Sequence, residues 1–129
     1  MAILVPNEEF TQLASEEQIT RTVQALETNG IRTLVVATGE EARSRVLDMI
    51  PSGVEVYNSV SRTLELIGLA ADIEHATRFQ PVRARLRSLD RATQQREMRQ
   101  LIARPDVLVG SVHAITEQGQ VLLASAAGT

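Results

Sequence analysis

The sequence predicts an α/β domain built on a parallel sheet. Short apolar runs rich in β-branched residues alternate with segments whose apolar residues recur every three to four positions, as strands and amphipathic helices do. The run LVVA at residues 34–37 is continuously apolar, which is typical of a strand buried on both faces. With 129 residues the chain is long enough to bury a core, and we expect one domain over residues 1–129.

The first half of the chain contains the clearest helix signals. Ser15 and Gln18 match a capping box, and apolar residues then repeat at helical spacing until an Asn-Gly pair ends the segment. Gly39 separates a strand predicted at residues 31–38 from a helix predicted at residues 40–50. The first two residues of that helix are glutamates, which the positive end of a helix dipole favours.

The second half continues the alternation. A helical stretch at residues 82–104 changes its apolar face near Asp90, so we expect a break or a change of packing partner there, and Asp90 is a candidate cap for the second part. The other expected elements are a strand at residues 54–58, helices at 62–69 and 70–79, a strand at 107–112, a turn at 117–120 and a strand at 121–127.

Composition excludes several classes of protein. The chain has no cysteine, which removes disulfides, iron–sulfur ligation and thiol catalysis, and it has two histidines, too few for a histidine-rich zinc site. The sequence therefore predicts no metal and no cofactor. Residues 1–10 lack the basic region and the length of a signal peptide, and no apolar run approaches the roughly twenty residues of a membrane span. We expect a cytoplasmic protein with no membrane partner.

Charge is unevenly distributed along the chain. Five glutamates accompany one arginine in residues 8–29, whereas eight arginines accompany two acidic residues in residues 78–104. These segments can pair within the fold, pair across a subunit interface, or simply face solvent, where charge pairs contribute little. Arg83, Arg87 and Arg91 are spaced to track phosphates, but the net charge of −3 and the lack of interleaved aromatic residues argue against nucleic-acid binding.

Polar residues gather where the strand predicted at residues 54–58 ends. Asn58, Ser59, Ser61 and Thr63 supply short polar side chains, and Arg62 adds a positive charge. In open parallel sheets, ligands bind beyond the carboxyl ends of strands, where a helix N-terminus offers free N–H groups to an anion. The sequence therefore predicts a site for an anionic or polar ligand here, unless Ser61 merely caps its own helix.

A second group of candidates lies at residues 110–119. Gly110 and Ser111 end a predicted strand, and Ser111 and His113 share a face if the strand continues through them. Their surroundings match no nucleophile elbow, so a serine hydrolase is not expected, and His113 is either catalytic or a hydrogen-bonded structural residue. Glu117 lies in the predicted turn and becomes a candidate only if that turn folds back over the strand ends.

Three runs of the sequence resemble a known family. NSVSRTLELIGL, RPDVLVGSVHA and AITEQGQVLLASAAG are similar to the lactate-utilisation (LUD) domain, and especially to its stand-alone, cysteine-free members of the lactate utilisation protein C type. The resemblance extends from about Ser15 to Thr129. Family members run on for several further strands and helices, so the resemblance implies either a C-terminally shortened form or a sheet that a partner chain completes.

The resemblance implies a fold and a role. The fold is a three-layer α/β arrangement like that of ribose-phosphate isomerase, glucosamine-phosphate deaminase and the CoA transferases, which often use a carboxylate as base or nucleophile. By position, Glu117 is the nearest counterpart of that carboxylate, with Gly110, Ser111, Gly119 and Gly128 in the loops around it. The role is in lactate oxidation beside iron–sulfur partner subunits, since this chain has no cysteine to hold a cluster.

The expected function is binding of a small anionic metabolite at residues 58–63 and 110–119, in lactate utilisation, as a subunit or accessory factor. One alternative is a non-enzymatic assembly or regulatory subunit that uses the two charged segments. Another is a sugar-phosphate isomerase or CoA-transferase-like enzyme that uses Glu117. We also expect a homo-oligomer, because a sheet that ends at a bare strand leaves an edge open to pairing.

Overall fold

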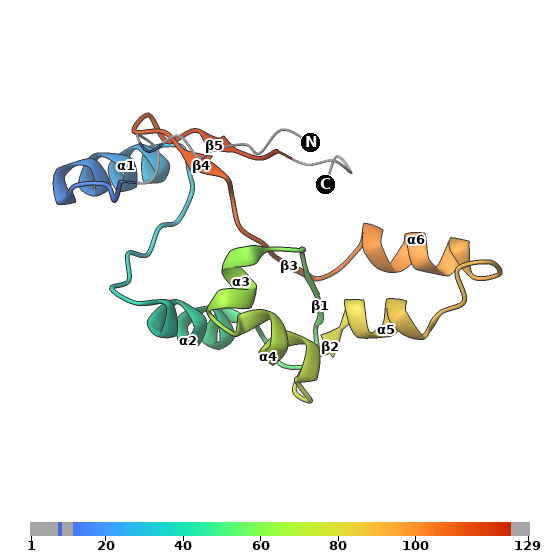
Figure 1. The fold of residues 1–129 in the computed structure, drawn as a ribbon. Coiled ribbons are helices and arrows are strands. Elements are labelled where there is room, and N and C mark those ends of the chain that lie inside the picture. Colours follow the sequence, from blue (N-terminus) through green and yellow to red (C-terminus); the bar gives the residue numbers. More distant parts are fainter. Residues whose placement is uncertain (1–7, 9–11, 125–129) are drawn as a thin grey trace. The chain divides into compact units, whose positions relative to one another are not determined.

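The computed structural model describes Glu8 and residues 12–124 (Figure 1). The chain divides into two compact units: unit 1 comprises Met1–Leu34 and Val112–Thr129, and unit 2 comprises Val35–Ser111. Each is described by itself, and the single domain expected over residues 1–129 stays a prediction. Residues 1–7, the last three residues of the strand predicted at 121–127, and Gly128 lie outside the described residues.

Unit 2 contains a parallel sheet of three strands. The strands are β1 (Glu55–Asn58), β2 (Gln80–Pro81) and β3 (Val107–Val109), in the order β2-β1-β3. Both neighbours pair with β1 in parallel, and helices flank the sheet, so the predicted α/β fold class is confirmed (Figure 1). Strand β2 was not predicted, because two residues that include a proline give no periodic signal.

Five helices complete unit 2: α2 (Gly39–Met49), α3 (Arg62–Leu66), α4 (Leu69–His75), α5 (Val82–Ser88) and α6 (Gln95–Ala103). Their N-termini show why the chain turns where it does. The Thr38 hydroxyl accepts a hydrogen bond from the Glu41 N–H and caps α2, and Ser61 caps α3 in the same way.

The core of unit 2 lies on one face of the sheet. Val56 and Val109 pack with apolar side chains from the helices and from the loop before β2: Ile50, Leu64, Leu69, Ile73 and Phe79. Burial of a side chain of this size contributes roughly 1.5–3 kcal/mol. Side chains alternate along a strand, so Tyr57 and Leu108 face the other side, where Leu108 is 65% exposed.

The strand predicted at residues 31–38 does not form. Residues 31–36 have no regular structure, and Leu34 and Val35 are 55% and 62% exposed. The apolar, β-branched composition is typical of a strand, but a strand also needs a neighbour that bonds its N–H and C=O groups. No other described segment pairs with this one. The border between the two units falls between these two residues.

The break predicted near Asp90 is confirmed, but the role predicted for Asp90 is wrong. Helix α5 ends at Ser88, and α6 begins at Gln95 with no side-chain cap. The Asp90 carboxylate instead accepts hydrogen bonds from the Ala92 N–H and the Thr93 hydroxyl, both at 2.9 Å, which lower its pKa. Asp90 therefore stabilises the turn between the helices.

Unit 1 combines one helix with a hairpin. Helix α1 (Glu16–Thr28) begins with the predicted Ser15–Gln18 capping box, in which both reciprocal hydrogen bonds are present. The strands β4 (Ala114–Ile115) and β5 (Val121–Leu122) pair antiparallel around the predicted turn, where Gly119 has a φ of +76°. Among the described residues no helix combines the length and apolar character that crossing a membrane requires.

Candidate functional site

The predicted residues of unit 2 meet at the carboxyl ends of two neighbouring strands. Asn58, the last residue of β1, is in register with Val109, the last residue of β3. The next residue, Ser59, donates its N–H to the Val109 carbonyl at 2.9 Å. The segments after β1 and β3 therefore leave the sheet side by side, as the sequence predicts for a parallel pair.

Gly110 allows these two segments to approach closely. A Cβ atom on Gly110 would lie 2.8 Å from the Ser59 hydroxyl oxygen, shorter than side chains tolerate. The missing side chain thus leaves room for Ser59.

Two serine hydroxyls join across the strand ends. The Ser61 and Ser111 hydroxyl oxygens are 2.7 Å apart, and Ser61 also accepts the Leu64 N–H at 3.2 Å. Ser61 is only 6% exposed, whereas Ser111 is half-buried. A hydroxyl has one proton to donate, so when Ser61 donates to Ser111, the Ser111 proton is free for another acceptor. Ser61 therefore caps its own helix, the alternative role considered for it in the sequence analysis, and it also positions Ser111.

Asn58 is fully buried, with its amide unpartnered. The side chain is 0% exposed, and neither the amide oxygen nor the amide nitrogen has a hydrogen-bond partner among the described residues. Each buried unsatisfied polar group costs about 1–3 kcal/mol. An asparagine held at this cost, at the end of β1, is a candidate for binding rather than for stability.

A carboxylate near Asn58 is already neutralised by arginines. Glu74 on α4 accepts a hydrogen bond from Arg87 at 2.8 Å and lies 3.6 Å from Arg83. The Arg87 hydrogen bond is the main cause of a lowered pKa of Glu74, and the Asn58 amide adds to it by proximity, without a hydrogen bond of normal geometry. Sequence reasoning missed Glu74, because only the fold brings α4 and α5 together at β1.

Arg62 and Thr63 take no part in the contacts between the two strand ends. Both are exposed, in the first turn of α3, and neither contributes to the Ser61–Ser111 pair.

The remaining predicted residues belong to the hairpin of unit 1. Glu117 accepts hydrogen bonds from Arg21 at 2.7 Å and from Gln18 at 3.1 Å, and these bonds, that of Arg21 first, lower the pKa of its carboxyl. A carboxylate held ionised in this way is a weak general base. Its observed contacts join the turn to α1.

His113 and Gly119 also have structural contacts in this hairpin. The His113 Nδ1 accepts the Ala124 N–H at 3.1 Å, and its backbone N–H donates to Leu122. A Cβ atom on Gly119 would lie 2.7 Å from the backbone carbon of Ala25 on α1. Strand β3 ends at Val109, before the end predicted at Val112. The strand therefore does not continue through Ser111 and His113, and the condition under which they share a face is not met.

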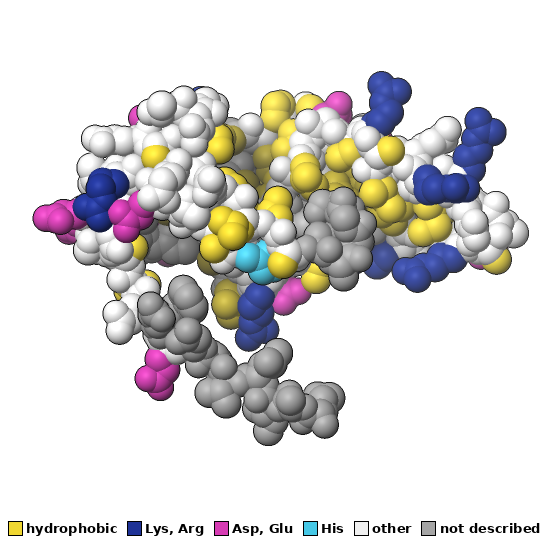
Figure 2. All heavy atoms as spheres, turned by 90° about the horizontal axis from the view of Figure 1, so that it is seen from above, with side chains coloured by type: hydrophobic (Ala, Val, Ile, Leu, Met, Phe, Trp, Pro, Cys, Tyr) yellow, Lys and Arg dark blue, Asp and Glu magenta, His cyan; other side chains and the backbone are white. Residues whose placement is uncertain are grey.

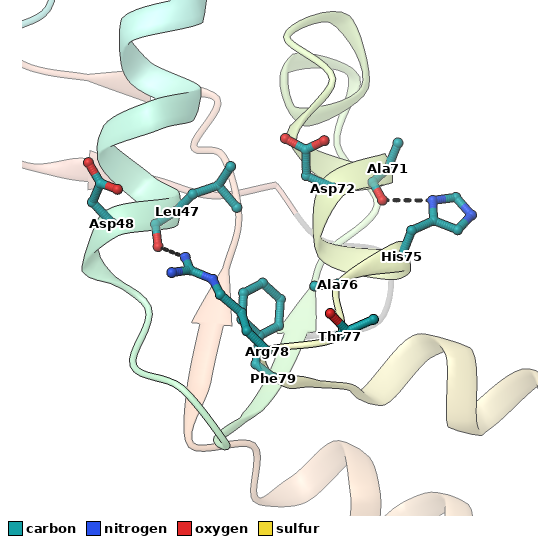
Figure 3. Close-up of a pocket in the computed structure, with 9 residues that line it drawn as sticks. All are labelled: Leu47, Asp48, Ala71, Asp72, His75, Ala76, Thr77, Arg78 and Phe79. Carbon is teal, nitrogen blue, oxygen red and sulfur yellow. Dashed lines mark hydrogen bonds between the residues drawn. The ribbon is translucent and has the colours of Figure 1, made fainter.

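A hollow of about 540 Å³ lies elsewhere in unit 2, between the C-terminal ends of α2 and α4 (Figure 3). Its lining is Leu47, Asp48, Ala71, Asp72, His75, Ala76, Thr77, Arg78 and Phe79. Figure 3 shows Arg78 reaching from beside Phe79 to the Leu47 carbonyl, and His75 turned back onto the Ala71 carbonyl. Helix C-termini favour positive charge, which Arg78 already supplies, so the hollow suits an anion poorly.

The described residues contain no group of three or more histidine, cysteine, aspartate or glutamate side chains placed to hold a metal ion. The strand ends present hydroxyl and amide groups, which bind polar ligands without being able to carry out acid–base chemistry near neutral pH.

Comparison with known proteins identifies the family. The family model described as the LUD domain matches residues 19–129, while no curated protein and no solved structure matches the chain. The matched residues include α1 from Ile19 onward, the β1 and β3 strand ends and the β4–β5 hairpin. Since the match covers most of the sequence, the chain belongs to the LUD domain family.

Proposed function

We propose that this LUD-domain protein binds a small anionic metabolite at the carboxyl ends of β1 and β3, in a lactate-utilisation role. The observation that carries the proposal is the Ser61–Ser111 hydroxyl pair at the same strand ends as the unpartnered amide of Asn58. The name of the family supports the lactate-related role.

The chemistry of this end of the sheet favours an acceptor-rich ligand. When Ser61 donates to Ser111, the Ser111 hydroxyl has a proton to donate to a ligand. A hydrogen bond to a charged group contributes about 1.5–3 kcal/mol, more than one to a neutral group. The Asn58 amide is fully buried, so a ligand reaches it only after the groups that cover it shift. Satisfying that amide would then add to the affinity.

The binding experiment compares matched charged and neutral probes. L-Lactate, ribose 5-phosphate and acetyl-CoA are titrated against the protein, with lactamide and ribose as neutral counterparts, and the melting temperature is followed by circular dichroism. We expect at least one anion to raise the melting temperature saturably while its neutral counterpart does not. Absence of a shift with all three anions contradicts the proposal.

Two serine variants then locate the site. Ser111→Ala removes the free donor and should weaken the binding of the anion about 10-fold or more, the equivalent of at least about 1.4 kcal/mol. Ser88→Ala is the matched control, because Ser88 is an exposed serine of the same unit whose hydroxyl bonds only to Arg85. Equal weakening by both variants would mean that the anion binds elsewhere.

In the proposed role the protein is a subunit or accessory factor in the cytoplasm, beside iron–sulfur subunits that carry the electrons. The resemblance to the family implies such partners, because cysteine thiolates hold iron–sulfur clusters and this sequence has no cysteine. The isomerase or transferase alternative predicts that Glu117→Gln abolishes turnover and leaves binding intact. The contacts of Glu117 with Arg21 and Gln18 favour instead a loss of hairpin stability without a specific loss of turnover.

A second candidate function is that of an assembly or regulatory subunit. It is favoured by charged side chains on α1 and around α6 that make little use of ion pairs within the described structure.

A further inference from the structure

The α5–α6 region carries a cluster of unpaired arginines. Arg91, Arg96 and Arg99 are exposed, and none forms an ion pair with a described residue, whereas Arg83, Arg85 and Arg87 of α5 all do. The two acidic neighbours are otherwise engaged: Asp90 bonds the turn, and Glu97 accepts a hydrogen bond from Gln94. Figure 2 shows basic side chains gathered around apolar ones at the α5–α6 end of the molecule.

This cluster surrounds a shallow hollow. Arg91, Gln95, Met98 and Arg99 line a space of about 390 Å³ on the surface of the α5–α6 pair. Two guanidinium groups around one thioether suit an amphipathic surface that has carboxylates at its edges. We call these residues, with Arg96, the arginine face.

Helix α1 presents a surface of opposite charge. Glu16, Glu17 and Glu27 are exposed, and at 100° per residue they fall within one side of the helix, together with Thr20 and Gln24. Among the described residues, their only ion pair is that of Glu17 with Arg21. The distance is 4.0 Å and the Glu17 side chain is 90% exposed, a geometry that contributes little. We call this side of α1 the acidic face.

We propose that the protein forms a reciprocal dimer in which the acidic face of each α1 binds the arginine face of a second copy. The inference rests on the assembly role, the second candidate function, and does not depend on the anion site. Charge complementarity carries it, because each face has three charges of one sign with almost no partner within the described structure. A two-fold dimer contains each contact twice, so two modest contacts add in one assembly.

The experiment reverses the charges of each face separately. One variant carries Glu17→Lys and Glu27→Lys, the other Arg91→Glu and Arg99→Glu, and sedimentation equilibrium gives the dissociation constant at 0.05 M and 0.5 M salt. We expect wild type to dimerise, high salt to weaken the dimer because it screens exposed charges, and each variant alone to raise the dissociation constant at least 10-fold.

Mixing the two variants gives the decisive result. In the mixed pair, both contacts are again between opposite charges, one in the wild-type sense and one reversed, so an equimolar mixture should recover the dimer. Arg45→Glu is the matched control, since Arg45 is an exposed arginine of α2 without an ion pair among the described residues, and it should leave the wild-type dissociation constant unchanged.

Four outcomes overturn the proposal. They are a wild type that stays monomeric at all concentrations, a dimer that tolerates both reversals, variants that fail to recover the dimer on mixing, and a monomer whose arginine face instead binds a polyanion such as heparin. Circular dichroism of each variant confirms that α1 and α6 are folded, so a loss of dimer is not a loss of structure. Thermal shifts with the anions of the binding experiment, measured on the same variants, separate failure of this proposal from failure of the anion site.

Discussion

The segments after β1 and β3 in unit 2 and the β4–β5 turn in unit 1 contain similar residues, namely glycine, a hydroxyl residue and a polar side chain able to bind a ligand. In unit 1 these groups already have partners within the unit: Glu117 accepts a hydrogen bond from Arg21, and Gly119 packs against the backbone of Ala25. In unit 2, the Asn58 amide has no hydrogen-bond partner of normal geometry among the described residues, and Ser111 has a free proton when Ser61 donates to it. The residue types alone do not mark a site; unsatisfied bonding capacity does.

The largest expected effect on stability is that of a substitution at Gly119. Gly119→Ala adds a Cβ 2.7 Å from the Ala25 backbone at a φ of +76°, so strain and overpacking together should lower the free energy of unfolding of unit 1 by about 2–4 kcal/mol. Urea unfolding followed by circular dichroism measures the loss, and hydrogen exchange at the hairpin N–H of His113 shows whether it is local.

Gly30→Ala is the control for this variant. Gly30 has a φ of +80° but open space around its Cβ position, so its substitution should cost only the strain, about 1–2 kcal/mol. If the two glycines prove equally costly, the contact between the hairpin and α1 is not what requires Gly119.

The next effect has the opposite sign. Asn58→Leu replaces an unpartnered buried amide by an apolar side chain of similar size, and should raise the free energy of unfolding by about 1–2 kcal/mol while abolishing anion binding. Val56→Ala, at the neighbouring buried position of β1, should instead destabilise by about 2 kcal/mol. An Asn58→Leu protein that is less stable than wild type would show that the amide supports the fold.

The two serines of the strand ends should separate stability from binding. Ser61→Ala removes the cap of α3 and should cost about 1 kcal/mol in urea unfolding. Ser111→Ala leaves that cap in place, so it should cost less stability and more affinity. The reverse order would remove Ser111 from the proposed site.

The smallest effect is the pH dependence of the hairpin. Folding lowers the pKa of Glu117, so its contacts stabilise unit 1 above the ordinary glutamate pKa of about 4.3 and this contribution is lost as the pH falls through the lower folded value. Glu117→Gln should flatten this loss. Hydrogen exchange of the Thr116 N–H, corrected for intrinsic rates, compares both proteins from pH 6 to pH 3; identical profiles would exclude Glu117 as the group responsible.

Local signals in the sequence determined much of the fold. The capping box before α1, the break near Asp90, the hairpin turn and the strand end at Asn58 all depend on a few neighbouring residues. Such signals survive without knowledge of the rest of the chain, which is why these elements, the α/β class and the family were predictable.

Only the tertiary structure decided what each candidate residue does. Whether residues 31–38 form a strand depends on a bonding neighbour, and whether Glu117 is free depends on Arg21, 96 positions away in the sequence. The sequence pattern gives the polarity and spacing of the side chains, whereas their burial and their hydrogen-bond partners arise from long-range packing. That packing joined Ser61 to Ser111 and left the Asn58 amide without a hydrogen-bond partner among the described residues, so the proposed site became recognisable only in the folded chain.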